Sequence, residues 1–596
     1  MQMNIKVGVF SAFARLLVIF AKAAPLMFFL TVLFMLLSGI ATGLMTPALQ
    51  YFFDSATELV GGYTDTAPVF IALAVLAVTY IATEILLGVD GYVTWIFFDK
   101  AQGDVCMDIH RKMSCISPID FENTSMLDSV NKAVEAKDYA GRFVFQLMSL
   151  AFFLVSFYGT LGVYLFTVRP VLAFAIPLVF VPTFLTHVLR AKVFAKVEDT
   201  SAPVRRELDY YENCIVGREN FKETRILGAV SYFKGLFSDC LVILNRLMFR
   251  ASVKSDMAEF GMKLLSLAGY VGILLLLFFS VMDGYISIGA FAAVFATVGR
   301  MFGFMNGRVN SAMRLIARDF GKVRNYLRFL DMPVREGEEI DIPRNVDIEL
   351  RGVSFSYPLA EHKAVDGVNL KIKHGETIAI VGENGSGKST LVRLITGLYL
   401  PSEGDVLHGQ VNTKTASERS LFKGVSAVFQ KFQRYQMTLR ENIGISEVTG
   451  ATDDAALDKV SLEAGVEKDN ASFTNGYETM LSREFDGVDL SGGQWQRVAI
   501  ARGFFRPHEV ILLDEPTAAI DPIEETNIYN RFAEISKDKT AVIVTHRLGS
   551  VKLADRILVM CQGKLVEQGS HAELMAKDGE YARLYTAQEQ WYSRCG

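Results

Sequence analysis

Six long apolar stretches in the first 310 residues limit what this 596-residue chain can fold into. Each is close to the roughly 20 residues that a helix needs to cross about 30 Å of hydrocarbon. Buried core helices of a soluble protein are the alternative, but six such stretches in succession favour six transmembrane helices. The predicted spans are Pro25–Thr46, Val69–Leu87, Phe145–Val168, Leu172–Val188, Leu264–Met282 and Ile286–Phe304.

The charges between the spans predict their orientation. The connection Phe53–Pro68 contains acidic residues and no Lys or Arg, whereas Asp99–Arg142 contains six basic residues. By the positive-inside rule, the second connection and both termini face the cytoplasm of a plasma-membrane protein. Ala191–Lys263 is a second long inner connection with a helical pattern, so the membrane helices are expected to continue into the cytoplasm. Met1–Ala23 is expected to form an amphipathic helix on the inner membrane surface rather than a signal peptide.

Composition excludes some functions. Hydrophobic residues make up 51% of the chain and charged residues 21%, and the net charge is only −5. A chain without a basic field is not expected to bind nucleic acid. The six cysteines fall on predicted cytoplasmic segments and lack metal-ligand spacing, so neither a disulfide framework nor a zinc site is expected.

The character of the chain changes after about residue 330. Short apolar runs alternate with helical patterns there, which is typical of a soluble α/β domain. Arg335–Arg344 is charged and flanked by prolines, and it predicts a linker. We therefore expect a transmembrane domain over residues 1–330, a linker over residues 331–345 and a soluble α/β domain over residues 346–596, which is expected to be a nucleotide-binding domain because it contains a glycine-rich loop after a buried-strand pattern.

A phosphate-binding loop is the clearest motif of the second half. The buried-strand pattern Thr377–Val381 runs into a glycine-rich loop, and a helical pattern, Leu391–Leu398, follows. In this context the backbone N–H groups and the helix N-terminus face phosphates. Lys388 is expected to reach the β- and γ-phosphates, and Ser389 to bind Mg²⁺. The expected nucleotide ligands in the loop are Gly382, Asn384, Gly385, Ser386, Gly387, Lys388, Ser389 and Thr390.

Two further segments carry chemistry. A second apolar strand pattern ends in Asp514 and Glu515, at the edge where an α/β sheet presents its ligands. Asp514 is suited to the Mg²⁺ shell, and Glu515 to a base that orients or deprotonates the attacking water. A Ser-Gly-Gly turn opens the helical pattern Trp495–Phe505 and predicts a second anion site, which has a use if it completes the nucleotide site of another copy. Its expected ligands are Ser491, Gly492, Gly493 and Gln494.

The order of the motifs resembles the ATP-binding cassette of ABC transporters. The series consists of the phosphate loop, Gln430 in Val428–Lys431, Leu490–Gln494, Ile511–Pro516, Ala518–Asp521 and Thr545-His546. With six predicted helices before the cassette, the whole chain resembles an ABC exporter half-transporter, with the type I exporter (type IV ABC) fold.

The resemblance implies roles for further residues. Tyr357 would stack on adenine, and His546 would contact the γ-phosphate. Gln430 would sense the γ-phosphate and join Ser389 and Asp514 around Mg²⁺. Asp521 would link the two ATP sites of a dimer.

The same resemblance implies how the chain works. Ser491 and Gly493 would bind ATP held by the Lys388 of a partner copy, so two ATP molecules would be sandwiched in a dimer. All hydrolytic elements are present in one chain, which favours a homodimer and leaves a heterodimer open. The segments Pro118–Ser125 and Gly217–Gly228 resemble coupling helices that transmit cassette motion into alternating access.

The cargo is predicted from the segment around the second anion site. Arg483–Arg502 resembles the cassettes of lantibiotic and related peptide exporters, which favours a peptide. A multidrug or lipid exporter, a nucleotide-gated channel and an importer stay open as alternatives. Ionisable residues inside spans face a cavity or pair with one another. The candidates are Glu84, Asp90, Arg300 and His187, and an ion pair between Glu84 and Arg300 is the structural alternative.

Overall fold

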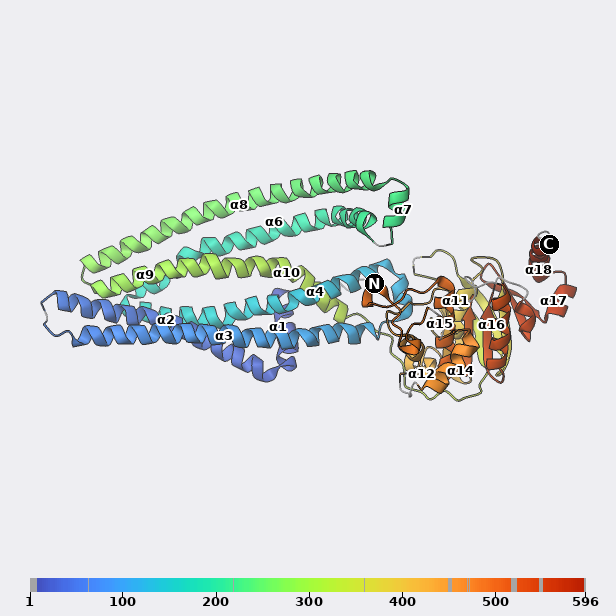
Figure 1. Ribbon diagram of the computed structural model, residues 1–596. Coiled ribbons are helices and arrows are strands. Elements are labelled where there is room, and N and C mark those ends of the chain that lie inside the picture. The colour runs from blue at the N-terminus through green and yellow to red at the C-terminus, as the bar shows by residue number, and fades with distance from the viewer. Residues whose placement is uncertain are drawn as a thin grey trace. The chain divides into compact units, whose positions relative to one another are not determined.

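The protein is represented by a computed structural model, which describes residues 8–62, 64–217, 219–358, 360–448, 453–468, 470, 472–515, 522–545 and 550–593. Contacts divide the chain into two units (Figure 1). The first comprises Met1–Ser114 and Asp128–Met332, and the second comprises Cys115–Leu127 and Pro333–Gly596. A short segment from the apolar half therefore packs with the C-terminal half.

The first unit is built from helices. Among the described residues, five helical stretches are long and apolar enough to cross a membrane, in agreement with five of the six predicted spans. The remaining predicted span, Leu172–Val188, lies in a continuous helix whose stretch Pro170–Pro182 is apolar. The elements are α1 (Val9–Ala23), α2 (Pro25–Val60), α3 (Ala67–Met113), α4 (Thr124–Met148), η2 (Ser149–Leu154), α5 (Val155–Val168), α6 (Pro170–Val216), α7 (Phe221–Ile226), α8 (Val230–Met282), α9 (Ile288–Phe304), η3 (Met305–Val309) and α10 (Asn310–Leu330).

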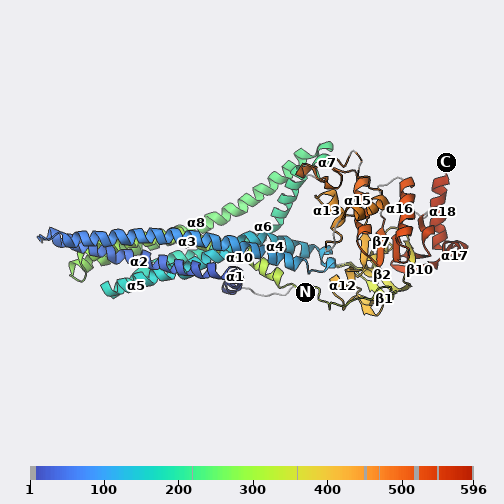
Figure 2. The same cartoon turned by 60° about the horizontal axis from the view of Figure 1, so that its bottom comes forward.

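Several helices are much longer than a bilayer is thick. Helix α3 has 47 residues and α8 has 53, or about 70 and 80 Å at 1.5 Å per residue. They therefore extend well beyond about 30 Å of hydrocarbon, as the charged helical patterns between the spans predicted. Helix α6 runs alongside α8, and α2 alongside α3 (Figures 1 and 2).

Small residues allow α2 to approach its neighbours closely. Gly39 and Gly43 form a Gly-x-x-x-Gly pattern on the side of α2 that packs against η2 and α5. A Cβ added at Gly43 would lie 2.8 Å from the Cβ of Thr160, closer than atoms pack without displacement. Such glycines favour close helix packing in membranes, where apolar burial gives no driving force.

Two π-helical turns lie within these long helices. The π-turn η2 joins α4 to α5, and η3 joins α9 to α10. The two turns lie near one another: the ring centroids of Phe153 in η2 and of Phe304, the residue that precedes η3, are 6.1 Å apart. The guanidinium of Arg308 in η3 also lies 4.4 Å from the centre of the Phe153 ring.

Ion pairs hold the helices together. Arg142 of α4 donates two hydrogen bonds, of 2.6 and 3.0 Å, to the fully buried carboxylate of Asp319 in α10. Arg15 of α1 makes a bidentate contact of 2.7 Å with Asp331, just after α10. The amphipathic character predicted for the N-terminal stretch is present in α1, since Ala12, Leu16 and Phe20 form its buried face.

The second unit has the predicted α/β fold, and its described strands form two sheets. An antiparallel sheet has the strand order β2-β1-β4-β5, and a mainly parallel sheet has the order β10-β9-β3-β8-β7-β6. The strands are β1 (Ile348–Phe355), β2 (Val365–Ile372), β3 (Thr377–Val381), β4 (Glu403–His408), β5 (Val411–Asn412), β6 (Val425–Val428), β7 (Val510–Asp514), β8 (Thr540–Val544), β9 (Arg556–Cys561) and β10 (Lys564–Gly569).

Helices pack around the sheets, and two of them, α11 and α15, begin with predicted nucleotide-site residues. Helix α11 packs with the first sheet in one core, and α15 lies in the core formed with β6 and β7. The helices are α11 (Lys388–Ile395), α12 (Glu418–Phe422), α13 (Leu439–Gly444), α14 (Asp454–Ala464), α15 (Gly492–Phe505), α16 (Pro522–Ile535), α17 (His571–Ala576) and α18 (Glu580–Ser593), with short 3₁₀ turns η1 (Pro118–Glu122), η4 (Gly476–Glu478), η5 (Arg483–Phe485) and η6 (Ser550–Leu553).

The expected linker is fastened to this unit at its start. The side chain of Arg335 is only 5% exposed, and it donates to the backbone oxygen of Gly397 at 3.0 Å and to Glu418 at 3.2 Å. Glu338 also pairs with the backbone near Ala416. The charged composition that predicts a linker therefore marks a strand-like connection with ordered contacts.

Candidate nucleotide-binding site

The sheet register brings the phosphate loop and the acidic pair to one edge. Ile380 of β3 and Asp514 of β7 both pair with Val544 of the intervening strand β8. Gly382 follows β3 directly, and Glu515 follows β7 directly. The carboxyl ends of parallel strands are where such sheets bind ligands. The predicted catalytic acids therefore lie beside the predicted phosphate loop.

The phosphate loop has a backbone that only glycine adopts easily. Gly385 and Gly387 have φ angles of 80° and 99°, in the left-handed region. A Cβ added at Gly387 would also collide with the backbone oxygen of Ala364. The loop then leads into α11, whose N-terminal N–H groups are free to face a phosphate.

Lys388 is held inside this loop. Its Nζ donates to the backbone oxygens of Gly382 at 3.0 Å and Glu383 at 2.9 Å. Burial lowers the pKa of Lys388, and the neighbouring carboxylates of Glu515 and Asp514 oppose that shift. A buried cation of this kind favours an incoming polyanion, because a phosphate would supply the charge that the loop carbonyls do not.

One buried hydroxyl of the loop provides a direct test of fit for a phosphate. The side chain of Ser386 is 4% exposed, and its Oγ has no hydrogen-bond partner among the described residues. Unpaired buried hydroxyls are costly, and a phosphate oxygen would satisfy this one. The remaining predicted loop residues, Asn384, Ser389 and Thr390, lie on the same turn or at the start of α11.

The acidic pair forms a small polar cluster with two other predicted residues. Ser389 Oγ lies 3.4 Å from Asp514 Oδ1, and Gln430 Nε2 donates to Glu515 Oε2 at 2.6 Å. Burial raises the pKa of Glu515, and burial together with the Glu515 charge raises the pKa of Asp514. A hydroxyl, an amide and one carboxylate fit Mg²⁺, which takes few protein ligands and completes its shell with phosphates and water.

The predicted adenine residue Tyr357 lies close to the same helix. Its hydroxyl is 3.0 Å from Thr390 Oγ1 and accepts a hydrogen bond of 2.9 Å from Arg393. The ring makes edge contacts with Phe355 and Tyr399. Arg393 and Tyr399 were not among the predicted site residues; Arg393 lies one helical turn after Thr390, and that spacing is the signal that could have found it.

The predicted second anion site is a capped and accessible helix start. Ser491 caps α15, accepting from Gln494 N–H at 3.3 Å and donating its own N–H to the Gln494 side chain at 3.0 Å. Gln494 also donates to Ser472 at 2.9 Å. Ser491 and Gly492 are exposed, and Gly493 is half-buried. The start of α15 is therefore capped by a side chain and accessible from outside the domain.

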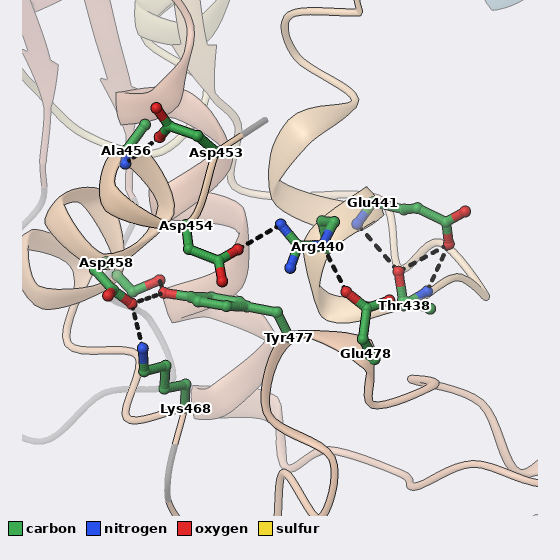
Figure 3. Close-up of polar contacts among 11 residues, drawn as sticks. Thr438, Arg440, Glu441, Asp453, Asp454, Ala456, Asp458, Lys468, Tyr477 and Glu478 are labelled. Atoms are coloured by element: carbon green, nitrogen blue, oxygen red, sulfur yellow. Dashed lines mark hydrogen bonds and ion pairs between the residues drawn. The ribbon is translucent and has the colours of Figure 1, made fainter. Parts of the chain in front are cut away.

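A polar network stabilises the small helical region before that turn (Figure 3). Arg440 of α13 bridges Asp454 at 2.8 Å and Glu478 at 2.6 Å, and the hydroxyl of Tyr477 donates to Asp458 at 2.8 Å. The network joins α13 to α14, which packs against α15. It thereby connects the segment that follows Gln430 to the helix that Ser491 caps.

Two predicted site residues, His546 and Asp521, lie outside the described residues. The side chain of His187, a candidate for cargo contact, is also outside the described part. Of the segment Gly217–Gly228, the structure describes α7 and its flanks but not Arg218.

The charged candidates in the membrane helices have different surroundings. Arg300 contacts Met45 Sδ at 3.5 Å and donates to Thr297 Oγ1 at 3.2 Å, and no ion pair joins it to Glu84 in the described part of the chain. Glu84 is exposed on α3, and Asp90 accepts from Thr94 at 3.3 Å. Arg300 borders an open apolar hollow of about 420 Å³, lined otherwise by Met45, Leu49, Leu73, Leu76, Ala77, Tyr80 and Ile81.

The fold and the site together define a phosphate-loop ATPase domain in a chain with a multi-helix membrane unit. A protein-family model described as ABC transporter matches residues 365–518, which include the phosphate loop, the exposed turn and the acidic pair. The second unit therefore contains an ABC transporter ATP-binding domain, and relatives of the chain include ABC exporters. The predicted family is confirmed.

Curated relatives include transporters of two cargo classes. The chain is 40% identical over 240 residues to the subtilin transport ATP-binding protein SpaT of Bacillus subtilis, covering 40% of this chain and 39% of that protein. It is 27% identical over 542 residues to the nisin transport ATP-binding protein NisT of Lactococcus lactis, covering 86% of each. It is 30% identical over 372 residues to the ATP-dependent lipid A-core flippase of Chromohalobacter salexigens, covering 62% of this chain and 63% of the flippase.

A solved structure shows the fold of the whole chain. The structure of a bacterial Atm1-family ABC exporter with ATP bound superposes with a TM-score of 0.79 at 20% identity, covering 94% of this chain and 99% of that one. The predicted fold class, a helical exporter membrane domain followed by a nucleotide-binding domain, is confirmed.

Proposed function

We propose that this ABC transporter hydrolyses ATP to export an amphipathic peptide. The assembly of Lys388, Ser389, Gln430, Asp514 and Glu515 at one sheet edge carries the ATPase part of the proposal. The similarity to the subtilin and nisin transport proteins, together with the Arg483–Arg502 segment, supports a peptide as the cargo.

Each residue of the cluster has a chemical task in this proposal. Lys388 and the loop N–H groups bind the β- and γ-phosphates, and Ser389, Gln430 and Asp514 would hold Mg²⁺. Bound Mg²⁺ would neutralise phosphate charge. Glu515 accepts the proton of the attacking water, and Gln430 orients the Glu515 carboxylate through the 2.6 Å hydrogen bond. The proposed role of His546 is a contact with the γ-phosphate.

The working form is proposed to be a homodimer. Ser491 and Gly493 lie at the start of α15, where they would complete the ATP site of a second copy. Asp521 would connect the two sites. The ATP-binding domain and both termini are proposed to be cytoplasmic, because the basic residues between the spans gather on the Asp99–Arg142 side.

Cargo class is tested by reconstituting the full chain in inside-out proteoliposomes. A nisin-like amphipathic peptide is expected to raise ATPase activity at least twofold and to accumulate inside the vesicles in an ATP-dependent way. Glu515→Gln is the matched control; it should still bind ATP but lose about 100-fold or more of turnover, since it cannot accept the proton. A peptide that neither stimulates nor accumulates would overturn the peptide proposal.

Lipid export is the second candidate, and the 30% identity to a lipid A-core flippase favours it. In the same vesicles, ATP-dependent movement of lipid A between leaflets without peptide accumulation would support this candidate. A wild-type chain that does not hydrolyse ATP under any of these conditions would overturn the ATPase proposal itself.

A further inference from the structure

A continuous polar chain joins the segment Cys115–Leu127 to Tyr357. The hydroxyl of Tyr399 donates to Glu122 Oε1 at 2.7 Å, and Arg393 Nη1 lies 3.3 Å from that hydroxyl and 2.9 Å from the hydroxyl of Tyr357. Arg393 also lies 3.8 Å from Glu122. All of these residues belong to the second unit.

The hydrogen bonds made by Arg393 and by Glu122 have a fixed direction. An arginine side chain has only donors, so both tyrosine oxygens accept from Arg393. The Tyr399 hydroxyl donates to the Glu122 carboxylate, and the Tyr357 hydroxyl lies 3.0 Å from Thr390 Oγ1, where either hydroxyl can be the donor. The orientation of the Tyr357 phenol is therefore determined from two sides, by Thr390 and by Arg393.

Glu122, at one end of this series of hydrogen bonds, lies far from Tyr399 in the sequence. Glu122 ends η1, which lies between α3 and α4, two helices of the membrane unit. The segment nevertheless packs on the ATP-binding domain, where Ile119 contacts the core that contains α11 and Tyr399. Arg335 N–H also donates to the backbone oxygen of Cys115 at 3.2 Å.

Tyr399, in the middle of this series of hydrogen bonds, is held in place by packing. Tyr399 is 4% exposed, and its ring stacks on Phe355 at a centroid distance of 5.5 Å. Burial and the Glu122 carboxylate both raise the pKa of Tyr399, so its hydroxyl keeps its proton and remains a donor throughout the physiological range.

We propose that Arg393 and Tyr399 are positioning residues for Tyr357, and that the Glu122 carboxylate fixes the Tyr399 hydroxyl, so that the affinity for ATP depends on this series of hydrogen bonds. The proposal rests on the proposed ATP site, in which Tyr357 contacts the adenine. It assigns a function to three residues that belong to none of the ATP-binding motifs.

The test removes single groups along the chain in the full-length protein. Tyr399→Phe removes one hydroxyl and keeps the stacked ring, and it is expected to raise the KM for ATP about threefold to tenfold with kcat changed less than about twofold, as the loss of a hydrogen bond predicts. Glu122→Leu should have the same effect. Glu122→Gln keeps an acceptor oxygen and should return KM close to the wild-type value, and the double variant Glu122→Leu/Tyr399→Phe should be no worse than either single variant.

Matched controls separate this role from general destabilisation. Glu349→Gln alters an exposed ion pair with Arg351 on strand β1 and should leave the KM for ATP unchanged. Equal KM values for wild type, Tyr399→Phe and Glu122→Leu would overturn the proposal, and so would additive effects in the double variant or a failure of Glu122→Gln to restore affinity. ATP binding can also be measured in the Glu515→Gln background, where turnover is absent. This measurement tests the positioning of Tyr357 even if the ATPase proposal fails, so the two failures can be told apart.

Discussion

Glu515 shows at the residue scale how the site is held in an uncommon conformation. Its φ of 49° lies in the left-handed region, which costs a residue with a side chain on the order of 1 kcal/mol or more. The backbone N–H donates to Val544 at 3.0 Å, and the carboxylate accepts from Gln430. These contacts fix the carboxylate at the sheet edge, where the proposed proton transfer from water would take place.

His408 provides a pH-dependent contribution to stability that can be measured. Burial lowers the pKa of this histidine, whose neutral ring donates from Nε2 to the backbone oxygen of Ile395 at 2.8 Å. Because the folded-state pKa lies below the ordinary value of about 6.5, stability is complete above that pH. It is then lost, by at most about 1.4 kcal/mol per pH unit, as the pH falls below 6.5 toward the folded-state pKa.

The measurement is the melting temperature of the full chain between pH 7.5 and 5.5. His408→Gln donates a similar hydrogen bond without titrating, and it should flatten the fall at acid pH. His362→Gln, at an exposed position, should keep the wild-type slope. Parallel slopes for all three proteins would contradict the assignment.

At the scale of the element, close packing between α2 and α5 predicts that an added carbon at Gly43 lowers stability. Gly43→Ala should destabilise the membrane unit by about 1–3 kcal/mol, because its Cβ would overlap Thr160 and force the helices apart. Gly88→Ala in α3 is the matched control, since a Cβ there meets nothing within 4 Å. Thermal melting in detergent should show a lower midpoint for Gly43→Ala alone; equal midpoints would show that the interface tolerates the added carbon.

Elements that depend on local sequence were predictable, and those that depend on tertiary packing were not. Apolar runs predicted where helices cross the membrane, and glycine spacing predicted the phosphate loop, because both patterns act within one element. The docking of Glu122 on Tyr399 joins residues 277 positions apart, and no local pattern indicates it. The π-turns also went unpredicted, because an inserted residue leaves the apolar composition unchanged.

At the scale of the whole molecule, the proposed shared site predicts complementation between two inactive chains. Lys388→Met should abolish phosphate binding, and Ser491→Arg should block the turn that faces the partner's nucleotide. Each homodimer then has two defective sites, whereas a mixed dimer has one intact site and one with both defects. Co-expressed chains purified with two different tags should regain a measurable fraction of ATPase activity.

The control is a mixture of the same two proteins purified separately and combined without subunit exchange, which should stay inactive. Absence of recovery in the tagged mixed dimer would contradict the division of the ATP site between two copies. Full activity of the Ser491→Arg homodimer would remove the exposed turn from that site.

The two π-turns also affect how positions along the long helices should be counted. One extra residue in a helix rotates everything that follows by about 100° relative to an uninterrupted helix. A surface inferred for α10 by extending the repeat of α9 would therefore be assigned to the wrong side, and the same holds for α5 counted from α4. Spin labels or cysteine pairs placed on these helices need separate registers on each side of Ser149–Leu154 and Met305–Val309.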